Sequence, residues 1–227
     1  MNRYNLFHKI HKGLRALLYD TSMLLQRTDF TMEEEAGEAI SRVQFAVSLF
    51  DQYKQSEDLY MLPVMMDYEP GLADAFEQEH EGAYLLGKKL EKLAATFAAT
   101  TLPLEKITHS TELLSLFEEF TLFNILHMAR EEQVVNKVLW RYYTDAELQK
   151  IAWKIINAAE SPFVMPYNKW MFQGLNNNEI VRWLKEVKQT AREMEFQSLL
   201  KSAEAELHPH RWGLLQDVLC PGPLLAN

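Results

Sequence analysis

The chain lacks the features that mark secreted, membrane-spanning and nucleic-acid-binding proteins. Cys220 is its single cysteine, which excludes an internal disulfide and any cysteine-rich metal site. No run approaches the ~18 apolar residues of a membrane span, and residues 1–12 lack the apolar core of a signal peptide. Acidic residues outnumber basic ones by 32 to 23, a balance that repels a phosphate backbone. We therefore expect a cytoplasmic protein that binds neither nucleic acid nor a membrane.

Glycine and proline are also scarce, with eight of each in 227 residues, below the usual ~7% and ~5%. Few turn residues for this length indicate long secondary-structure elements. Leu, Ala, Glu, Lys and Met are frequent, and all five are good helix formers. The composition therefore predicts an all-α protein.

Helical periodicity divides the chain into two parts. Residues 1–142 contain four long helical segments, expected at about 4–27, 32–66, 71–98 and 112–142, which we interpret as an up-down-up-down four-helix bundle. Residues 143–227 are predicted to form a C-terminal helical extension packed on the bundle. In the extension we expect helices at about 144–158, 179–190 and 193–207, an irregular connection at 160–178 and a partly loose tail from His208.

Each long helix has an apolar stripe at three-four spacing that histidine, carboxylate or tyrosine side chains interrupt. The interruptions are His11 on the first helix, Tyr53 and Glu57 on the second, His80 on the third, and His127 and Glu131 on the fourth. A buried, unpaired carboxylate costs several kcal/mol, and no lysine or arginine lies on these stripes. Each buried glutamate needs a cation or a proton, and one bound metal site would neutralise both, so a metal ion is the expected partner.

The positions of these residues along the helices also agree. Counted from the connecting turns of an antiparallel bundle, the interruptions fall within one or two helical turns of a common level. The spacing His127-x-x-x-Glu131 repeats as Tyr53-x-x-x-Glu57, and each pair follows a histidine on the preceding helix. This weak internal duplication predicts two metal half-sites, and imidazole with carboxylate suits iron, manganese or zinc.

The sequence resembles the hemerythrin-like, or HHE cation-binding, domain family. The matching segments are Ile10–Arg15, Glu57–Pro63, Glu79–Glu81 and His127–Glu132, within residues 1 to 142. Residues 144–219 look like the helical extension of longer members. The resemblance implies a non-haem di-iron centre with bridging carboxylates, whose metal ligands are His11, Glu57, His80, His127 and Glu131. Zinc or manganese could replace the two iron ions.

Two positions depart from the family pattern. Tyr53 stands where the family has a histidine four residues before the glutamate; it could bind iron as phenolate or stay neutral beside an open coordination position. A visible tyrosinate band would distinguish the two. Tyr84 stands where oxygen carriers have a second histidine on the third helix, so a site like theirs is not expected. Residues that flank the ligands, including Glu79, Glu81 and Glu132, are predicted to lie on the surface.

Three functions fit these observations. The first is a non-haem di-iron protein that binds or senses oxygen, nitric oxide or iron. The second is a di-iron redox enzyme that reduces peroxide or takes part in iron or nitrosyl repair. The third is a structural bundle whose metal site has decayed at Tyr53. No catalytic nucleophile is apparent, and the extension could mediate a homodimer or a contact with another protein.

Overall fold

The computed structural model describes residues 3–158 and 161–219, and within these residues all regular secondary structure is helical. Cys220 lies outside the described residues. The helices of the first two-thirds are α1 (His8–Arg27), α2 (Glu33–Tyr60), α3 (Leu62–Met66), α4 (Pro70–Ala99), α5 (Pro103–Arg130), the π-helical turn η1 (Glu131–Val135), α6 (Asn136–Tyr142) and α7 (Asp145–Ala158). They are followed by α8 (Ser161–Gly174), α9 (Asn177–Thr190), α10 (Glu193–Glu206) and α11 (Pro209–Leu219). The class is all-α, as predicted, and none of the described helices is long and apolar enough to cross a membrane.

Prolines and acidic residues mark several helix starts. Glu33, Glu34 and Glu35 occupy the first turn of α2, where negative charge favours the helix dipole. Helix α2 ends at Tyr60, Met61 connects it to α3, and Pro63 lies in the first turn of α3. Pro103 begins α5, so this helix starts well before the predicted residue 112. Proline is preorganised for the first turn of a helix, where its missing N–H costs no hydrogen bond.

One prediction for the C-terminal third is wrong. The stretch predicted as an irregular connection, residues 160–178, contains the helix α8, with Pro166 inside it. Asn176, near the end of this stretch, caps the start of α9 in a capping box with Glu179. Within the tail predicted to be partly loose from His208 to Asn227, Pro209–Leu219 form α11, and residues 220–227 lie outside the described residues.

The described helices form two compact units. The first comprises residues up to His8 and the chain from Leu17 through α7, and the second comprises Lys9–Ala16 and α8 to α11. These units differ from the predicted division at residue 142, because α7 packs on α2 within the first unit.

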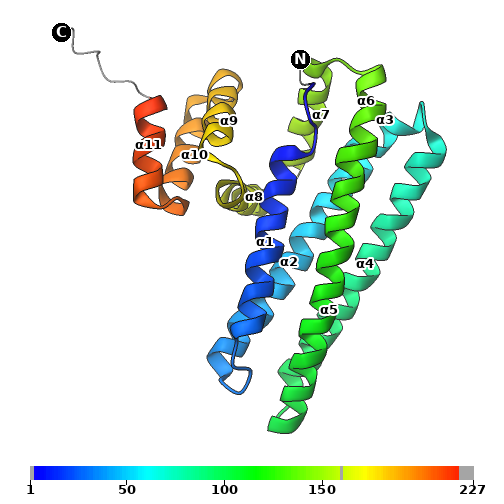
Figure 1. The fold of residues 1–227 in the computed structure, drawn as a ribbon, viewed down its shortest axis with the longest axis vertical. Coiled ribbons are helices and arrows are strands. Elements are labelled where there is room, and N and C mark those ends of the chain that lie inside the picture. The colour runs from blue at the N-terminus through cyan, green and yellow to red at the C-terminus, as the bar shows by residue number, and fades with distance from the viewer. Residues whose placement is uncertain (1–2, 159–160, 220–227) are drawn as a thin grey trace. The chain divides into compact units, whose positions relative to one another are not determined.

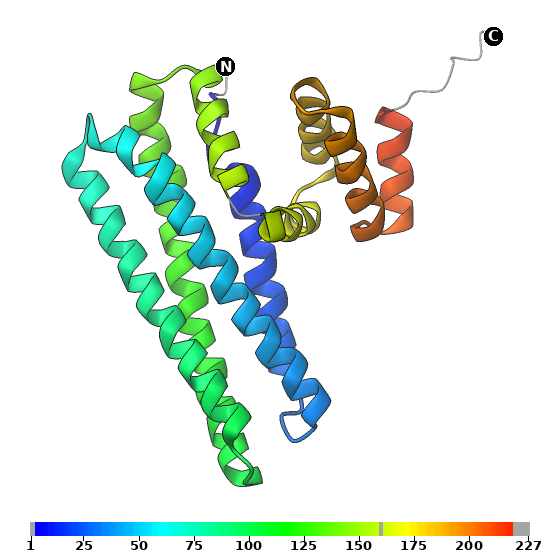
Figure 2. The same cartoon turned by 180° about the vertical axis from the view of Figure 1, so that it is seen from behind.

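The first unit is built around α2, α4 and α5. Seen from opposite sides, the three helices run along one another (Figure 1; Figure 2), and α4 packs on both α2 and α5. Fully buried aromatic side chains fill the interior; Phe50 and Phe120 meet edge to face with ring centroids 5.6 Å apart. The polar residues described below interrupt this apolar core.

The second unit has its own interior. Helix α10 packs on α8 and α9, and α11 packs on α9. Phe172 and Trp183 lie with ring centroids 4.8 Å apart among buried leucines. Lys9 and Lys12 form ion pairs with Glu186 and Glu179 at 2.5 and 2.7 Å, which attach the segment Lys9–Ala16 to α9.

Candidate metal centre

Four polar side chains meet inside the apolar core of the first unit. Glu57 comes from α2, His80 from α4, His127 from α5 and Glu131 from the first residue of η1. One potential ligand atom from each lies within 4.8 Å of the others. Both glutamates are completely buried, and each histidine is only 5% exposed. Among the described residues, this group has the donor set and the spacing to hold a metal ion.

The helices place these side chains by their local geometry. His127 and Glu131 are four residues apart, so both face the same side of the helix. At Glu131 the α-helical pattern gives way to the π-helical turn η1. A π-turn inserts an extra residue into the helix and occurs frequently at functional sites. Here it carries Glu131 into the same buried space as the two imidazoles.

Each histidine is oriented by a carboxylate on its outer side. His80 Nδ1 lies 2.5 Å from Asp58 Oδ1, and His127 Nδ1 lies 2.8 Å from Glu79 Oε2. Glu79 is itself held by an ion pair with Arg130. A carboxylate accepts hydrogen bonds, so in both pairs the proton is on Nδ1. This arrangement, common around metal-binding histidines, fixes the ring and leaves Nε2 available as a ligand.

Both Nε2 atoms face the centre of the group. They lie 3.1 Å from each other, and each lies 3.6 Å from a carboxylate oxygen, His80 from Glu57 and His127 from Glu131. Two imidazole lone pairs at 3.1 Å repel one another unless a proton or a metal ion lies between them. The inner atoms are therefore arranged as ligands around a cation.

Burial controls the protonation of the group. It lowers the pKa of His127 to about 3, an effect that His80 and Lys54 strengthen, so this imidazole is neutral at physiological pH. Burial also raises the pKa of both glutamates above their usual range. For Glu131 the charge of the neighbouring Glu57 adds to the effect. In the absence of metal, a proton reduces the repulsion between the carboxylates.

The donor set fits a divalent metal ion. Two neutral imidazoles and two carboxyl groups match the ligand preferences of zinc, manganese and non-haem iron, whereas thiolate-preferring ions are disfavoured. A metal ion would take the place of a proton on the carboxyl pair and accept the lone pairs of the two facing nitrogens. The group could thus bind a metal ion.

The other predicted site residues have different positions. Tyr53 is buried on α2, four residues before Glu57; its role as a phenolate ligand or a neutral phenol stays a prediction. His11 is fully buried on α1, in the segment Lys9–Ala16 that belongs to the second unit; its assignment as a ligand stays a prediction. Tyr84 is 46% exposed.

Three residues near the centre were not predicted from the sequence. Glu79, predicted to be a surface residue, is half-buried and orients His127. Asp58 plays the same part for His80. The prediction that the buried stripes carry no basic residue is wrong at Lys54, which is only 4% exposed. The sequence offered one signal for these three residues. Glu79, Asp58 and Lys54 lie directly next to His80, Glu57 and Tyr53 along the chain.

The buried carboxyl pair predicts a pH-dependent effect of Glu131→Gln on the metal-free protein. The folded-state pKa of Glu131 is raised well above 4.5, so ionisation destabilises the folded state increasingly as the pH rises above the unfolded value. Glutamine resembles the protonated form. We expect Glu131→Gln to be more stable than wild type by at least about 1 kcal/mol at pH 8, and this advantage to disappear near pH 4.5.

Urea unfolding of chelator-treated protein at several pH values measures this difference. Glu119→Gln, an exposed carboxyl on the same helix, is the control and should show little change. A stability difference for Glu131→Gln that is the same at pH 8 and pH 4.5 would contradict the explanation.

Comparisons with protein-family models, with curated proteins and with solved structures found no match, so the functional interpretation depends on the geometry of the residues themselves.

Proposed function

We propose that this chain is a hemerythrin-like non-haem iron protein that binds or senses oxygen, nitric oxide or iron itself. The observation that carries the proposal is the buried group of Glu57, His80, His127 and Glu131, whose inner atoms lie within 4.8 Å of one another. The proposal includes an up-down-up-down bundle, a centre of up to two iron ions with His11 as an additional ligand, and a cytoplasmic location.

The residues of the chain would have distinct roles in such a protein. Glu57, His80, His127 and Glu131 would hold the metal, while Asp58 and Glu79 keep the imidazoles in the ligating tautomer. Tyr53, buried four residues before Glu57 on α2, would lie beside the metal either as a further ligand or as a neutral phenol. Phe76 packs edge to face against His127, and the low polarity of this side of the site strengthens electrostatic interactions there. Bound iron would supply a Lewis-acidic, redox-active centre for a diatomic ligand.

Nitric oxide binding tests the proposed function. We expect protein loaded with Fe²⁺ under anaerobic conditions to give a new electron paramagnetic resonance or visible absorption signal on addition of nitric oxide. His127→Ala should lose this signal because it removes an inner ligand. His109→Ala is the matched control, since His109 lies on the same helix and contacts Glu112 rather than the centre.

The outcomes separate the candidate functions. A signal in wild type and His109→Ala, but not in His127→Ala, would support ligand binding at this centre. Equal signals in all three proteins would refute it. Sustained consumption of added peroxide that depends on His127 would instead favour the second candidate, a redox enzyme, for which the surface pocket that reaches His80 offers access.

A further inference from the structure

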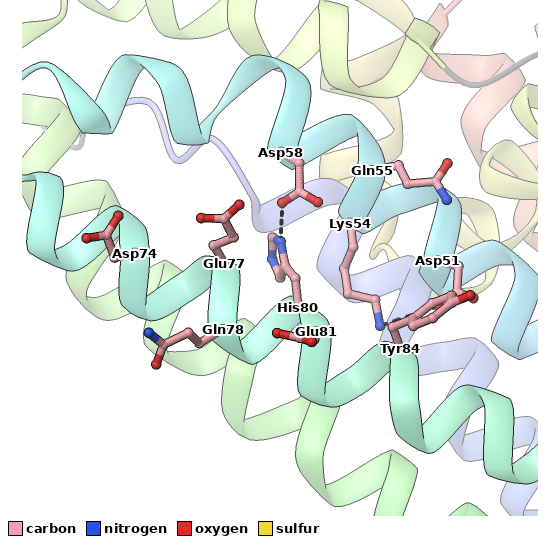
Figure 3. A pocket seen from close by; sticks show the side chains of 10 residues that line it. All are labelled: Asp51, Lys54, Gln55, Asp58, Asp74, Glu77, Gln78, His80, Glu81 and Tyr84. Atoms are coloured by element: carbon pink, nitrogen blue, oxygen red, sulfur yellow. Dashed lines mark hydrogen bonds and ion pairs between the residues drawn. The ribbon is translucent and has the colours of Figure 1, made fainter.

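An acidic pocket connects the protein surface with the metal centre. The pocket, of about 540 Å³, lies between α2 and α4 and includes His80 in its lining (Figure 3). Five carboxylates also line it, contributed by Asp51, Asp58, Asp74, Glu77 and Glu81. Lys54 lines the same pocket and contributes an ammonium group. The pocket therefore combines a strongly acidic wall with one buried cation.

Lys54 is held in an unusual environment for a lysine. Its side chain is 5% exposed, and Nζ lies 3.8 Å from Asp51 Oδ1, which is longer than a hydrogen bond. The Phe120 ring centroid is 5.8 Å from Nζ. Buried lysines are rare unless a charge partner compensates for their desolvation.

The compensating charges include the two metal-centre glutamates. Burial lowers the pKa of Lys54 to about 8, while Asp51, Glu57, Asp58 and Glu131 favour the charged form. At neutral pH most of the lysine is therefore an ammonium ion. Lys54 and Glu57 are both buried on α2, three residues apart and so on the same side of the helix, and Lys54 lines the same pocket as His80. The ammonium charge therefore lies beside the carboxylates that a metal ion would bind.

We propose that Lys54 is the internal counter-ion of the metal-free centre. Its ammonium group and the metal ion compete for electrostatic interaction with the carboxylates of Glu57 and Glu131. This inference rests on the proposed metal-binding function. A divalent ion at the carboxylates repels a nearby ammonium group. Lys54 therefore weakens metal binding and sets the affinity of the centre.

The acidic pocket provides a place for the displaced ammonium group. The lysine side chain is a flexible four-carbon stem, and the pocket that surrounds it has space for movement away from the centre. Asp74, Glu77 and Glu81 on α4 line the same pocket (Figure 3). When metal binds, the ammonium moves toward these carboxylates and keeps a charge partner.

Replacing the lysine tests the proposal. Lys54→Met keeps most of the side-chain length and removes the charge; we expect it to bind Zn²⁺, and Fe²⁺ under anaerobic conditions, at least about tenfold more tightly than wild type. Affinity is measured by competition with a chelating dye on the full-length protein, and folding by circular dichroism. Lys88→Met, which removes an exposed lysine paired with Glu91, should leave the affinity unchanged. Lys54→Gln provides a second neutral variant if the methionine variant does not fold.

Each outcome is informative. Tighter binding in the neutral Lys54 variants, with wild-type affinity in Lys88→Met, supports the counter-ion role. Unchanged or weaker binding in the Lys54 variants, while wild type binds metal, overturns this inference and leaves the proposed function intact. If wild type binds no metal but Lys54→Met does, the competition is supported and the native metal function is not. If none of the proteins binds metal, both proposals are refuted.

Discussion

Removing metal from the loaded protein is expected to lower its melting temperature by about 10 °C. A ligand that binds only the folded state stabilises it by ~4 kcal/mol when present at 1,000 times its Kd, and 1 kcal/mol corresponds to ~2–4 °C for a chain of this size. The physical source is the buried carboxyl pair, because a bound divalent cation neutralises both Glu57 and Glu131, whereas protonation of one carboxyl group neutralises the pair only partly. Thermal melting with Fe²⁺ and then with excess chelator, both anaerobic, measures the change.

The histidine variants control this experiment. His109→Ala should keep the full metal-dependent shift, whereas His127→Ala should lose it, because His127 contributes an inner nitrogen of the centre. If wild type melts at the same temperature with metal and with chelator, metal binding is not coupled to folding at this site.

Gly174→Ala is expected to destabilise the second unit by roughly 3 kcal/mol. A Cβ atom at Gly174 would lie 2.2 Å from the Lys12 carbonyl oxygen and 3.0 Å from the Gly13 nitrogen. These are backbone atoms, so no side-chain rotation relieves the clash. The segment Lys9–Ala16 and the end of α8 must therefore separate, which opens the interior of the unit.

Space, rather than backbone conformation, is the reason for glycine at this position, because no described glycine has a positive φ. Gly213→Ala is therefore a matched control: it lies inside α11 with nothing within 4 Å of the added Cβ, and alanine there should be neutral or stabilising by up to ~1 kcal/mol. Urea unfolding and limited proteolysis compare the two variants. Equal stability of Gly174→Ala and Gly213→Ala would show that the close approach can relax at little cost.

The helical class could be predicted because the signals are local. Helix-forming composition and three-four periodicity predicted the long helices, although the helix expected over 32–66 is divided at Met61 into α2 and α3. The errors came from residues whose effect depends on their exact position. Pro103 lies before the helix predicted to start at residue 112 but begins α5, and Asn176 lies in the stretch predicted to be irregular but caps α9.

The inner residues of the candidate centre could be predicted because a carboxylate on an apolar stripe is costly without a partner. Glu57 and Glu131 were found in this way, and the structure brings them together with His80 and His127. The supporting residues could not be found by the same argument. Glu79 is half-buried, and its role depends on which side chain of another helix it meets, which periodicity does not reveal.

The burial of Lys54 could not be predicted from a single stripe. Lys54 lies four residues after Phe50 and three before Glu57, so it shares their three-four spacing, and the face of α2 that packs in the interior is wider than the stripe through Tyr53 and Glu57. Burial of a neighbouring residue follows from the packing of α2 against other helices, which is a tertiary property.

Counting the metal ions bound per chain tests the central claim most directly. The full-length protein is dialysed to equilibrium against Fe²⁺ under anaerobic conditions, and elemental analysis is applied to wild type and to the double variant His80→Ala/His127→Ala. The account predicts one or two iron ions per chain in wild type and none in the double variant, which lacks both inner imidazoles. No iron in wild type, or equal amounts of iron in the two proteins, would contradict it.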